Sequence, residues 1–167
     1  AMRVFLDANI LFSAARSDGA IRQLLGLLQE SGHILCADAF VIEEARRNLR
    51  AKVPSSVPEL DALISGLERL PTFPVDAEIL AAIPLPEKDQ PVMAAAIRGG
   101  CDVLITGDRR HFGSLFGTLF QGVAVFSPAE ASALQRSGSR NRFDALGAAF
   151  AAAGGEDALA RMFAADA

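Results

Sequence analysis

The stretch Val103-Leu104-Ile105-Thr106-Gly107-Asp108 sets the architecture of this chain. A continuous apolar run that ends in a turn signal is typical of a strand buried on both faces. Such strands belong to parallel sheets covered by helices, where ligands bind beyond the carboxyl ends of the strands. Asp108 therefore lies where catalytic and ligand-binding residues are found in this kind of fold. The rest of the chain determines which other residues lie beside it.

Similar apolar runs alternate along the chain with stretches of helical periodicity. We expect strands at Arg3–Leu6, His33–Ala37, Val103–Thr106 and Val123–Phe126, with a short edge strand at Thr72–Val75. We expect helices at Ile10–Ala15, Ile21–Leu28, Ala39–Lys52, Glu59–Leu70, Asp76–Ala82 and Gln90–Arg98, and from Ser127 to about Gln135. This alternation predicts an α/β fold, with three α/β/α layers around a four- or five-stranded parallel sheet.

Composition limits the class of protein further. The chain has 167 residues, is 51% hydrophobic and carries a formal net charge of −4. These values predict one compact folded domain and disfavour non-specific binding of polyanions, although carboxylates loaded with metal present positive charge. No apolar run reaches the length of a membrane span, so we expect no membrane contact. Cys36 and Cys101 are expected to be reduced, buried thiols, which favours a cytoplasmic location.

Four carboxylates are expected at one edge of the sheet. They are Asp7 at the end of the first strand, Glu44 in the helix after the second, Asp89 at the start of the helix before the Val103 strand, and Asp108. Converging carboxylates repel one another unless a cation lies between them, and Mg²⁺ or Mn²⁺ prefers such oxygen ligands. An ion held in this way can activate water and bind a phosphodiester for in-line displacement.

Each of these acids also has a purely structural interpretation. Asp7 and Asp108 are ordinary turn residues, and Asp89 stands where a helix N-cap favours Asp. Glu43 could replace Glu44, and either could be a solvated helix acid. The spacing of the buried positions of that helix favours Glu44.

Several segments, taken in order, resemble the PIN domain family. They are Val4–Leu11, Val41–Leu49, Asp89 at the head of a helix, and Leu104–Asp108. The resemblance covers roughly residues 2–135 and implies a PIN-like fold with metal-dependent ribonuclease activity, as in bacterial VapC-type toxins of toxin–antitoxin pairs. It implies that Asp7, Glu44, Asp89 and Asp108 are the catalytic, metal-binding residues, with Asn9 and Thr106 orienting them. Whether the site holds one or two metal ions stays open.

Basic residues near the acids are candidates to bind the RNA backbone. Arg46, Arg47, Arg50 and Lys52 form a basic helix stretch, which is typical of a solvated face with ion pairs but could also bind phosphates. Arg109 and Arg110, directly after Asp108, are better placed to contact phosphates. His111 could shuttle protons or be structural. Most of the phenylalanines are expected in the core, without a stacking platform for bases.

The composition changes after Ser137, so we divide the chain into a nuclease domain at 2–135 and a linker with an amphipathic tail at 136–167. Arg140–Ala167 is either a loosely docked extension or an antitoxin-like peptide that covers the active-site groove. The family resemblance also implies an antitoxin protein as a partner, and a possible homodimer.

Two other classes of function compete with the nuclease. One is a non-catalytic PIN-fold module that binds RNA or a partner. The other is a receiver-type phospho-acceptor domain, which needs a lysine late in the chain, whereas the last lysine here is Lys88. A haloacid-dehalogenase-type phosphatase needs a second Asp where Asn9 stands.

Overall fold

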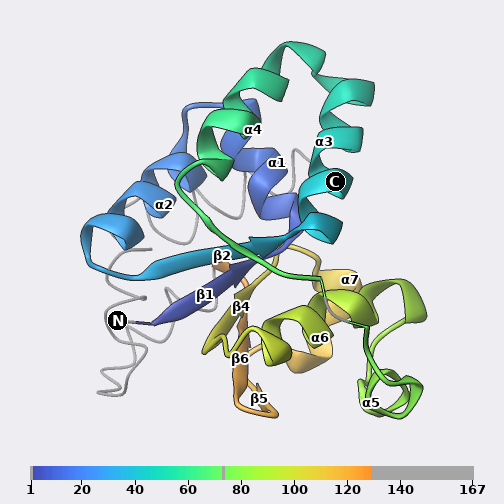
Figure 1. Ribbon diagram of the computed structural model, residues 1–167. Coiled ribbons are helices and arrows are strands. Elements are labelled where there is room, and N and C mark those ends of the chain that lie inside the picture. Colours follow the sequence, from blue (N-terminus) through green and yellow to red (C-terminus); the bar gives the residue numbers. More distant parts are fainter. Residues whose placement is uncertain (1, 73, 129–167) are drawn as a thin grey trace.

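The computed structural model describes residues 2–72 and 74–128, in which one sheet crosses the molecule (Figure 1). Its strands are β1 (Arg3–Leu6), β2 (Ile34–Asp38), β3 (Glu68–Leu70), β4 (Val103–Ile105), β5 (Leu119–Phe120) and β6 (Val123–Phe126). Their order is β3-β2-β1-β4-β6-β5, and β5 alone pairs antiparallel, with β6. The expected parallel sheet is confirmed, with β5 added at one edge.

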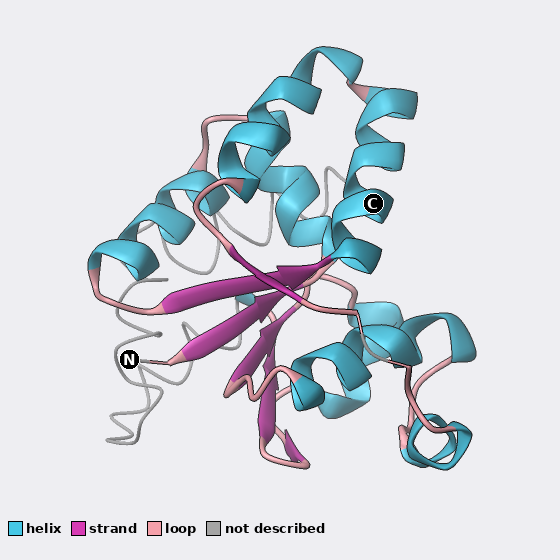
Figure 2. Cartoon of the chain, in the orientation of Figure 1, coloured by secondary structure: helices cyan, strands magenta, loops and turns pink. Residues whose placement is uncertain are grey.

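Helices cover both faces of this sheet (Figure 2). They are α1 (Ala8–Arg16), α2 (Ala20–Glu30), α3 (Ala39–Lys52), α4 (Val57–Ile64), α5 (Ala77–Ala82), α6 (Gln90–Arg98) and α7 (Arg109–Phe112), with 3₁₀ turns at Pro54–Ser56, Glu87–Asp89 and Gly113–Leu115. Strand order runs outward from β1 to β3 and then reverses to β4 and β6. Because crossovers between parallel strands are right-handed, this reversal places α1–α4 on one face and α5–α7 on the other.

The core forms where the central strands meet these helices. All three residues of β4 are fully buried, and so are Phe5 and Leu6 of β1. A strand covered on both faces must be apolar at every position, which explains the uninterrupted Val-Leu-Ile run. The polar residues that follow these strands are therefore fixed by a rigid scaffold.

The chain between α4 and α5 differs from the sequence prediction. The predicted helix Glu59–Leu70 ends at Ile64, and Glu68–Leu70 instead forms β3, parallel to β2. Glu68 also forms an ion pair of 2.6 Å with Arg3. Pairing with the sheet edge thus overrides the local helical periodicity. The predicted strand at Thr72–Val75 is wrong for its described residues, which belong to no strand.

Some predictions fall on residues that the structure does not describe. The expected helix from Ser127 to Gln135 lies almost wholly outside the described residues, as do the linker and tail at 136–167. Within the described part, no helix is long and apolar enough to cross a membrane. Cys36 and Cys101 are both buried and free, as expected.

Parallel pairing brings the ends of β1 and β4 to the same edge of the sheet. The backbone N–H of Asp7 donates to the carbonyl of Ile105 at 3.1 Å, and that of Thr106 donates to the carbonyl of Phe126 at 3.1 Å. Residues that directly follow β1, β4 and β6 are therefore in register. This edge carries the candidate site.

Candidate active site

A polar cavity of about 400 Å³ lies at the carboxyl edge of the sheet. Four acidic side chains from separate parts of the chain line it, namely Asp7, Glu44, Asp89 and Asp108. Three basic side chains, Arg47, Lys52 and Lys88, line it as well. The structure therefore brings all four carboxylates named from the sequence into one space.

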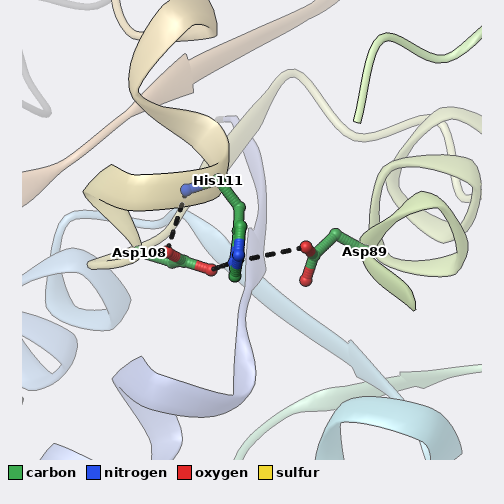
Figure 3. Close-up of side chains that lie close together, drawn as sticks. All are labelled: Asp89, Asp108 and His111. Atoms are coloured by element: carbon green, nitrogen blue, oxygen red, sulfur yellow. Dashed lines mark hydrogen bonds and ion pairs between the residues drawn. The ribbon is translucent and has the colours of Figure 1, made fainter. Parts of the chain in front are cut away.

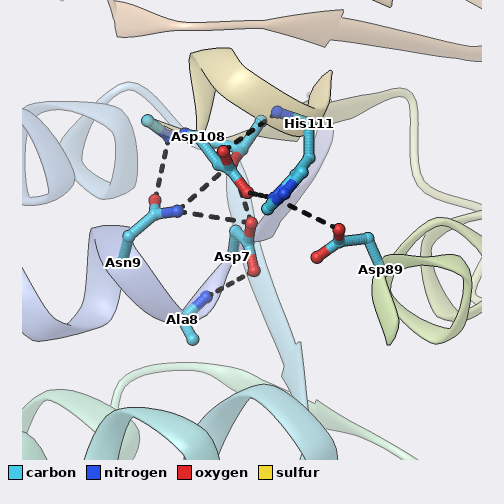
Figure 4. A network of polar contacts seen from close by, with 8 residues as sticks. Asp7, Ala8, Asn9, Asp89, Asp108 and His111 are labelled. Carbon is cyan, nitrogen blue, oxygen red and sulfur yellow. Dashed lines mark hydrogen bonds and ion pairs between the residues drawn. The ribbon is translucent and has the colours of Figure 1, made fainter. Parts of the chain in front are cut away.

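Asp7 is the most deeply buried of these acids, with 6% of its surface exposed. Its Oδ1 accepts a hydrogen bond of 2.7 Å from the backbone N–H of Ala8, and its Oδ2 accepts one of 2.7 Å from the hydroxyl of Thr106 (Figure 4). Burial, together with the charges of Glu44 and Asp108, raises the pKa of Asp7 to about 6 despite these bonds. A nearby cation stabilises the charged form of a carboxylate in this environment.

Asn9 and Thr106 join the end of β1 to the end of β4. The Thr106 hydroxyl also accepts hydrogen bonds from the backbone N–H of Asp108 at 3.1 Å and from the amide of Asn9 at 3.3 Å. The Asn9 side-chain oxygen accepts one of 2.9 Å from the backbone N–H of Gly107. These contacts hold Asp7 and Asp108 in fixed positions, and they fit the orienting role expected for Asn9 and Thr106.

Asp108, Asp89 and His111 form a group of potential metal ligands among the described residues (Figure 3). The Nδ1 of His111 lies 2.8 Å from Oδ2 of Asp108 and 3.4 Å from Oδ2 of Asp89. One ligand atom from each residue lies within 4.8 Å of the other two. Asp7 and Glu44 line the same cavity but are not members of this group.

Asp89 occupies the N-cap position of α6, yet its side chain makes no capping hydrogen bond. Its Oδ2 is buried and has no hydrogen-bond partner among the described residues. Burial raises the pKa of Asp89, an effect that His111 opposes and Asp108 reinforces. A buried oxygen without a hydrogen bond is costly, so the capping interpretation does not account for this carboxylate.

The two neighbouring glutamates of α3 have different surroundings. Glu44 is half-buried and lines the cavity, and its charge raises the pKa of Asp7. Glu43 is exposed and forms an ion pair of 2.8 Å with Arg46. The geometry therefore favours Glu44 as the acid that faces Asp7.

Three of the basic residues named from the sequence do not line the cavity, namely Arg46, Arg109 and Arg110. The guanidinium of Arg46 forms ion pairs of 2.8 Å with both Glu43 and Asp61. Arg109 stacks over the ring of Phe116 at 5.3 Å, and Arg110 is exposed on α7. Neither these two side chains nor Arg46 is part of the cavity wall.

Two other residues of the basic helix stretch, Arg47 and Lys52, do line the cavity. Arg47, Asn48 and Lys52 follow Glu44 at three, four and eight positions, which is one face of a helix. All three line the cavity together with Glu44. The spacing from Glu44 is the signal that could have separated Arg47 and Lys52 from Arg46 and Arg50 in the sequence.

Phe40 is a residue of the cavity wall that sequence reasoning missed. It is 43% exposed, and it lines both the polar cavity and an adjoining apolar cavity of about 230 Å³. Leu70, Val75 and Pro91 contribute to the walls of the apolar cavity. Most phenylalanines of the described residues pack in or against the core as expected, but Phe40 lines the cavity that the carboxylates share.

The donor set fits a hard divalent cation. Four carboxylates face one cavity, burial raises the pKa of Asp7 and of Asp89, and one buried oxygen of Asp89 has no hydrogen bond. Mg²⁺ and Mn²⁺ prefer such oxygen ligands and usually keep several waters. The residues present are therefore compatible with a metal site.

Comparison with known proteins gives matches to a protein family and to solved structures. The family model for the PIN domain matches residues 3–110. The fold is similar to a chain in the crystal structure of VapBC2 from Rickettsia felis bound to a DNA fragment from their promoter, with a TM-score of 0.58 and 16% sequence identity over 75% of this chain and 98% of that chain. No curated protein matches the sequence significantly. At this identity, the structural likeness shows a shared fold.

Proposed function

Because this chain belongs to the PIN domain family, we propose that it is an Mg²⁺- or Mn²⁺-dependent endoribonuclease, and that it acts as the VapC-like toxin of a toxin–antitoxin pair. The observation that carries the proposal is the single cavity lined by Asp7, Glu44, Asp89 and Asp108. A scaffold for RNA binding alone has no need to gather four carboxylates in one cavity and to desolvate two of them, Asp7 and Asp89, which costs free energy.

In this proposal the four carboxylates hold the divalent ion. When bound, the ion supplies a more acidic water and neutralises charge on the phosphorus oxygens. Thr106 and Asn9 keep Asp7 and Asp108 oriented through the hydrogen bonds between β1 and β4. Orientation of this kind lets a phosphodiester be attacked in line without rearrangement of the site.

The cations of the cavity wall bind the substrate in this proposal. Arg47, Lys52 and Lys88 lie beside the acids, where they can neutralise phosphates on either side of the scissile bond. Phe40 offers an exposed aromatic face at the same cavity. Unpaired bases stack on such faces, so we propose that the substrate is single-stranded or looped RNA.

We propose an antitoxin as the protein partner. The fold likeness to a chain of the VapBC2 complex supports this proposal. The inhibitory segment is either a separate protein or the chain's own Arg140–Ala167. Removal of residues 140–167 distinguishes the two, because faster RNA cleavage is expected only if the tail covers the cavity. A homodimer and a cytoplasmic location, which free buried thiols support, complete the proposal.

Cleavage of an unstructured RNA oligonucleotide with Mn²⁺ tests the enzymatic proposal. The parent protein should cut it, while Asp7→Asn and Asp108→Asn should lose most of the activity. Asp61→Asn is the matched control, because Asp61 is an exposed acid paired with Arg46 and does not line the cavity. Equal cleavage by all four proteins would refute the assignment. Binding of RNA without cleavage by the parent would favour a non-catalytic module.

A further inference from the structure

His111 occupies a position that the proposed carboxylate site does not explain. It lies in α7, three residues after Asp108, and its backbone N–H donates a hydrogen bond of 3.1 Å to Oδ1 of Asp108. The same residue turns Nδ1 of its ring toward Oδ2 of Asp108 and Oδ2 of Asp89 (Figure 3). The imidazole therefore faces the gap between two carboxylates that stand at the starts of different helices.

The distances in this group match those between neighbouring ligands of one metal ion. Ligand atoms at about 2.0–2.2 Å from a six-coordinate ion lie about 3 Å apart along each edge of the octahedron. The two distances from Nδ1, 2.8 Å to Asp108 and 3.4 Å to Asp89, lie on either side of that value. Oδ2 of Asp89, which is buried and without a hydrogen bond, is one of the two oxygens.

We propose that His111 binds the metal ion through Nδ1, and that this nitrogen ligand makes the site select Mn²⁺ over Mg²⁺. The inference rests on the proposed function, since Asp89 and Asp108, which His111 contacts, line the cavity of the proposed active site, although His111 itself is not part of the cavity wall. Imidazole nitrogen suits transition metals, whereas Mg²⁺ prefers oxygen ligands and water. In the bound form Nδ1 provides its lone pair and Nε2 carries the ring proton.

The position of His111 supports this role. Its side chain is 23% exposed, so the ring is neither locked in the core nor free in solvent. The Asp108 cap fixes the first turn of α7 and thereby the direction of the ring. The other histidine of the described part, His33, contacts the backbone N–H of Met2 through Nδ1 at 3.1 Å.

Metal titration calorimetry and pulsed electron paramagnetic resonance test the proposal. The parent, His111→Gln and the matched control His33→Gln are each titrated with Mn²⁺ and with Mg²⁺. Loss of an outer contact to a metal ligand costs about 10- to 100-fold in affinity, and loss of a ligand should cost at least as much. We therefore expect His111→Gln to weaken Mn²⁺ binding at least about tenfold, with Mg²⁺ binding unchanged. His33→Gln should leave both affinities unchanged.

The spin-echo signal of Mn²⁺ bound to the parent gives a readout that needs no variant. Coordination by imidazole predicts modulation from a directly bound nitrogen, and this modulation should be absent in His111→Gln. A parent spectrum without nitrogen modulation would overturn the proposal. So would tighter binding of both metals by His111→Gln, because His111 would then be only a cation that fills the site when metal is absent.

Failure of this inference and failure of the proposed function are separable. RNA cleavage by a protein whose Mn²⁺ shows no nitrogen coupling would reject the histidine ligand and keep the nuclease. Nitrogen-coupled Mn²⁺ in a protein that cuts no RNA would keep the ligand and reject the nuclease.

Discussion

Asp7→Asn is expected to stabilise the metal-free protein while it abolishes activity. Burial raises the pKa of Asp7 from 3.8 to about 6 in the folded protein. A tenfold change in proton affinity corresponds to about 1.4 kcal/mol, so keeping Asp7 charged costs the fold about 3 kcal/mol at neutral pH. A neutral amide removes this cost, because it carries no charge to desolvate.

Part of that gain in stability is lost because Asp7→Asn breaks a hydrogen bond with Thr106. Oδ1 of an asparagine can still accept from the N–H of Ala8, but its NH₂ cannot accept from the Thr106 hydroxyl as Oδ2 of Asp7 does. The Thr106 hydroxyl already accepts from Asp108 and Asn9, so it cannot readily reverse its role. A lost bond of this kind costs about 1 kcal/mol. We expect a net increase of about 2 kcal/mol in the free energy of unfolding.

The effect has a defined pH dependence. The folded state binds the Asp7 proton more tightly than the unfolded state, so the contribution of Asp7 to stability is fully present below about pH 3.8 and is lost as pH rises through about 6. The difference in the free energy of unfolding between Asp7→Asn and the parent should therefore be largest above pH 6 and should vanish near pH 4.

Urea denaturation in the presence of a chelator measures this difference at about pH 7.5 and about pH 4, on either side of the expected transition. Asp61→Asn serves as the control, since Asp61 is an exposed ion-pair partner whose removal should change stability by no more than about 1 kcal/mol. The desolvation cost assigned to Asp7 is disproved if Asp7→Asn is no more stable than the parent at the higher pH. It is also disproved if the advantage of Asp7→Asn is the same at both pH values.

Four further outcomes are expected. Thr106→Val should lower the free energy of unfolding by about 1–3 kcal/mol and reduce kcat, because it removes the hydroxyl that bonds both Asp7 and Asp108. Urea denaturation measures the first effect, and RNA cleavage measures the second. Arg47→Ala and Lys52→Ala should raise KM for RNA and reduce its salt dependence, whereas Arg46→Ala, outside the cavity, should change neither. Phe40→Ala should weaken RNA binding by about 1–3 kcal/mol in a titration with a fluorescent oligonucleotide, and Phe40→Tyr should retain it. Mn²⁺ should raise the Tm of the parent and a chelator should reverse the rise, while an unchanged Tm at saturating Mn²⁺ would contradict a folded-state metal site.

The sequence was sufficient to place the acids because parallel strands align their carboxyl ends. Asp7 and Asp108 closely follow strands that are buried on both faces, so their convergence depends only on the pairing of β1 with β4. Glu44 followed from the helical register of α3, which places it beside the buried positions. These inferences needed no knowledge of side-chain contacts.

Other features depend on contacts between distant parts of the chain. Glu68–Leu70 has the periodicity of a helix end, and its strand conformation arises from pairing with β2 and from the ion pair with Arg3. Arg46 was indistinguishable from Arg47 by composition, and only the position of Asp61 on α4 shows which guanidinium is already paired. The contact of His111 with Asp89 joins α7 to the start of α6 and could not be read from spacing.

Binding of a divalent ion among these carboxylates underlies both the proposed activity and the proposed role of His111. Anomalous X-ray diffraction from a crystal that contains Mn²⁺ locates such an ion without reference to any variant. We expect a peak inside the cavity, within about 2.2 Å of carboxylate oxygens of Asp89 and Asp108 and on the side that faces Asp7. Bound manganese found only outside this cavity, with the cavity itself filled by solvent, would show that the carboxylates do not form a metal site.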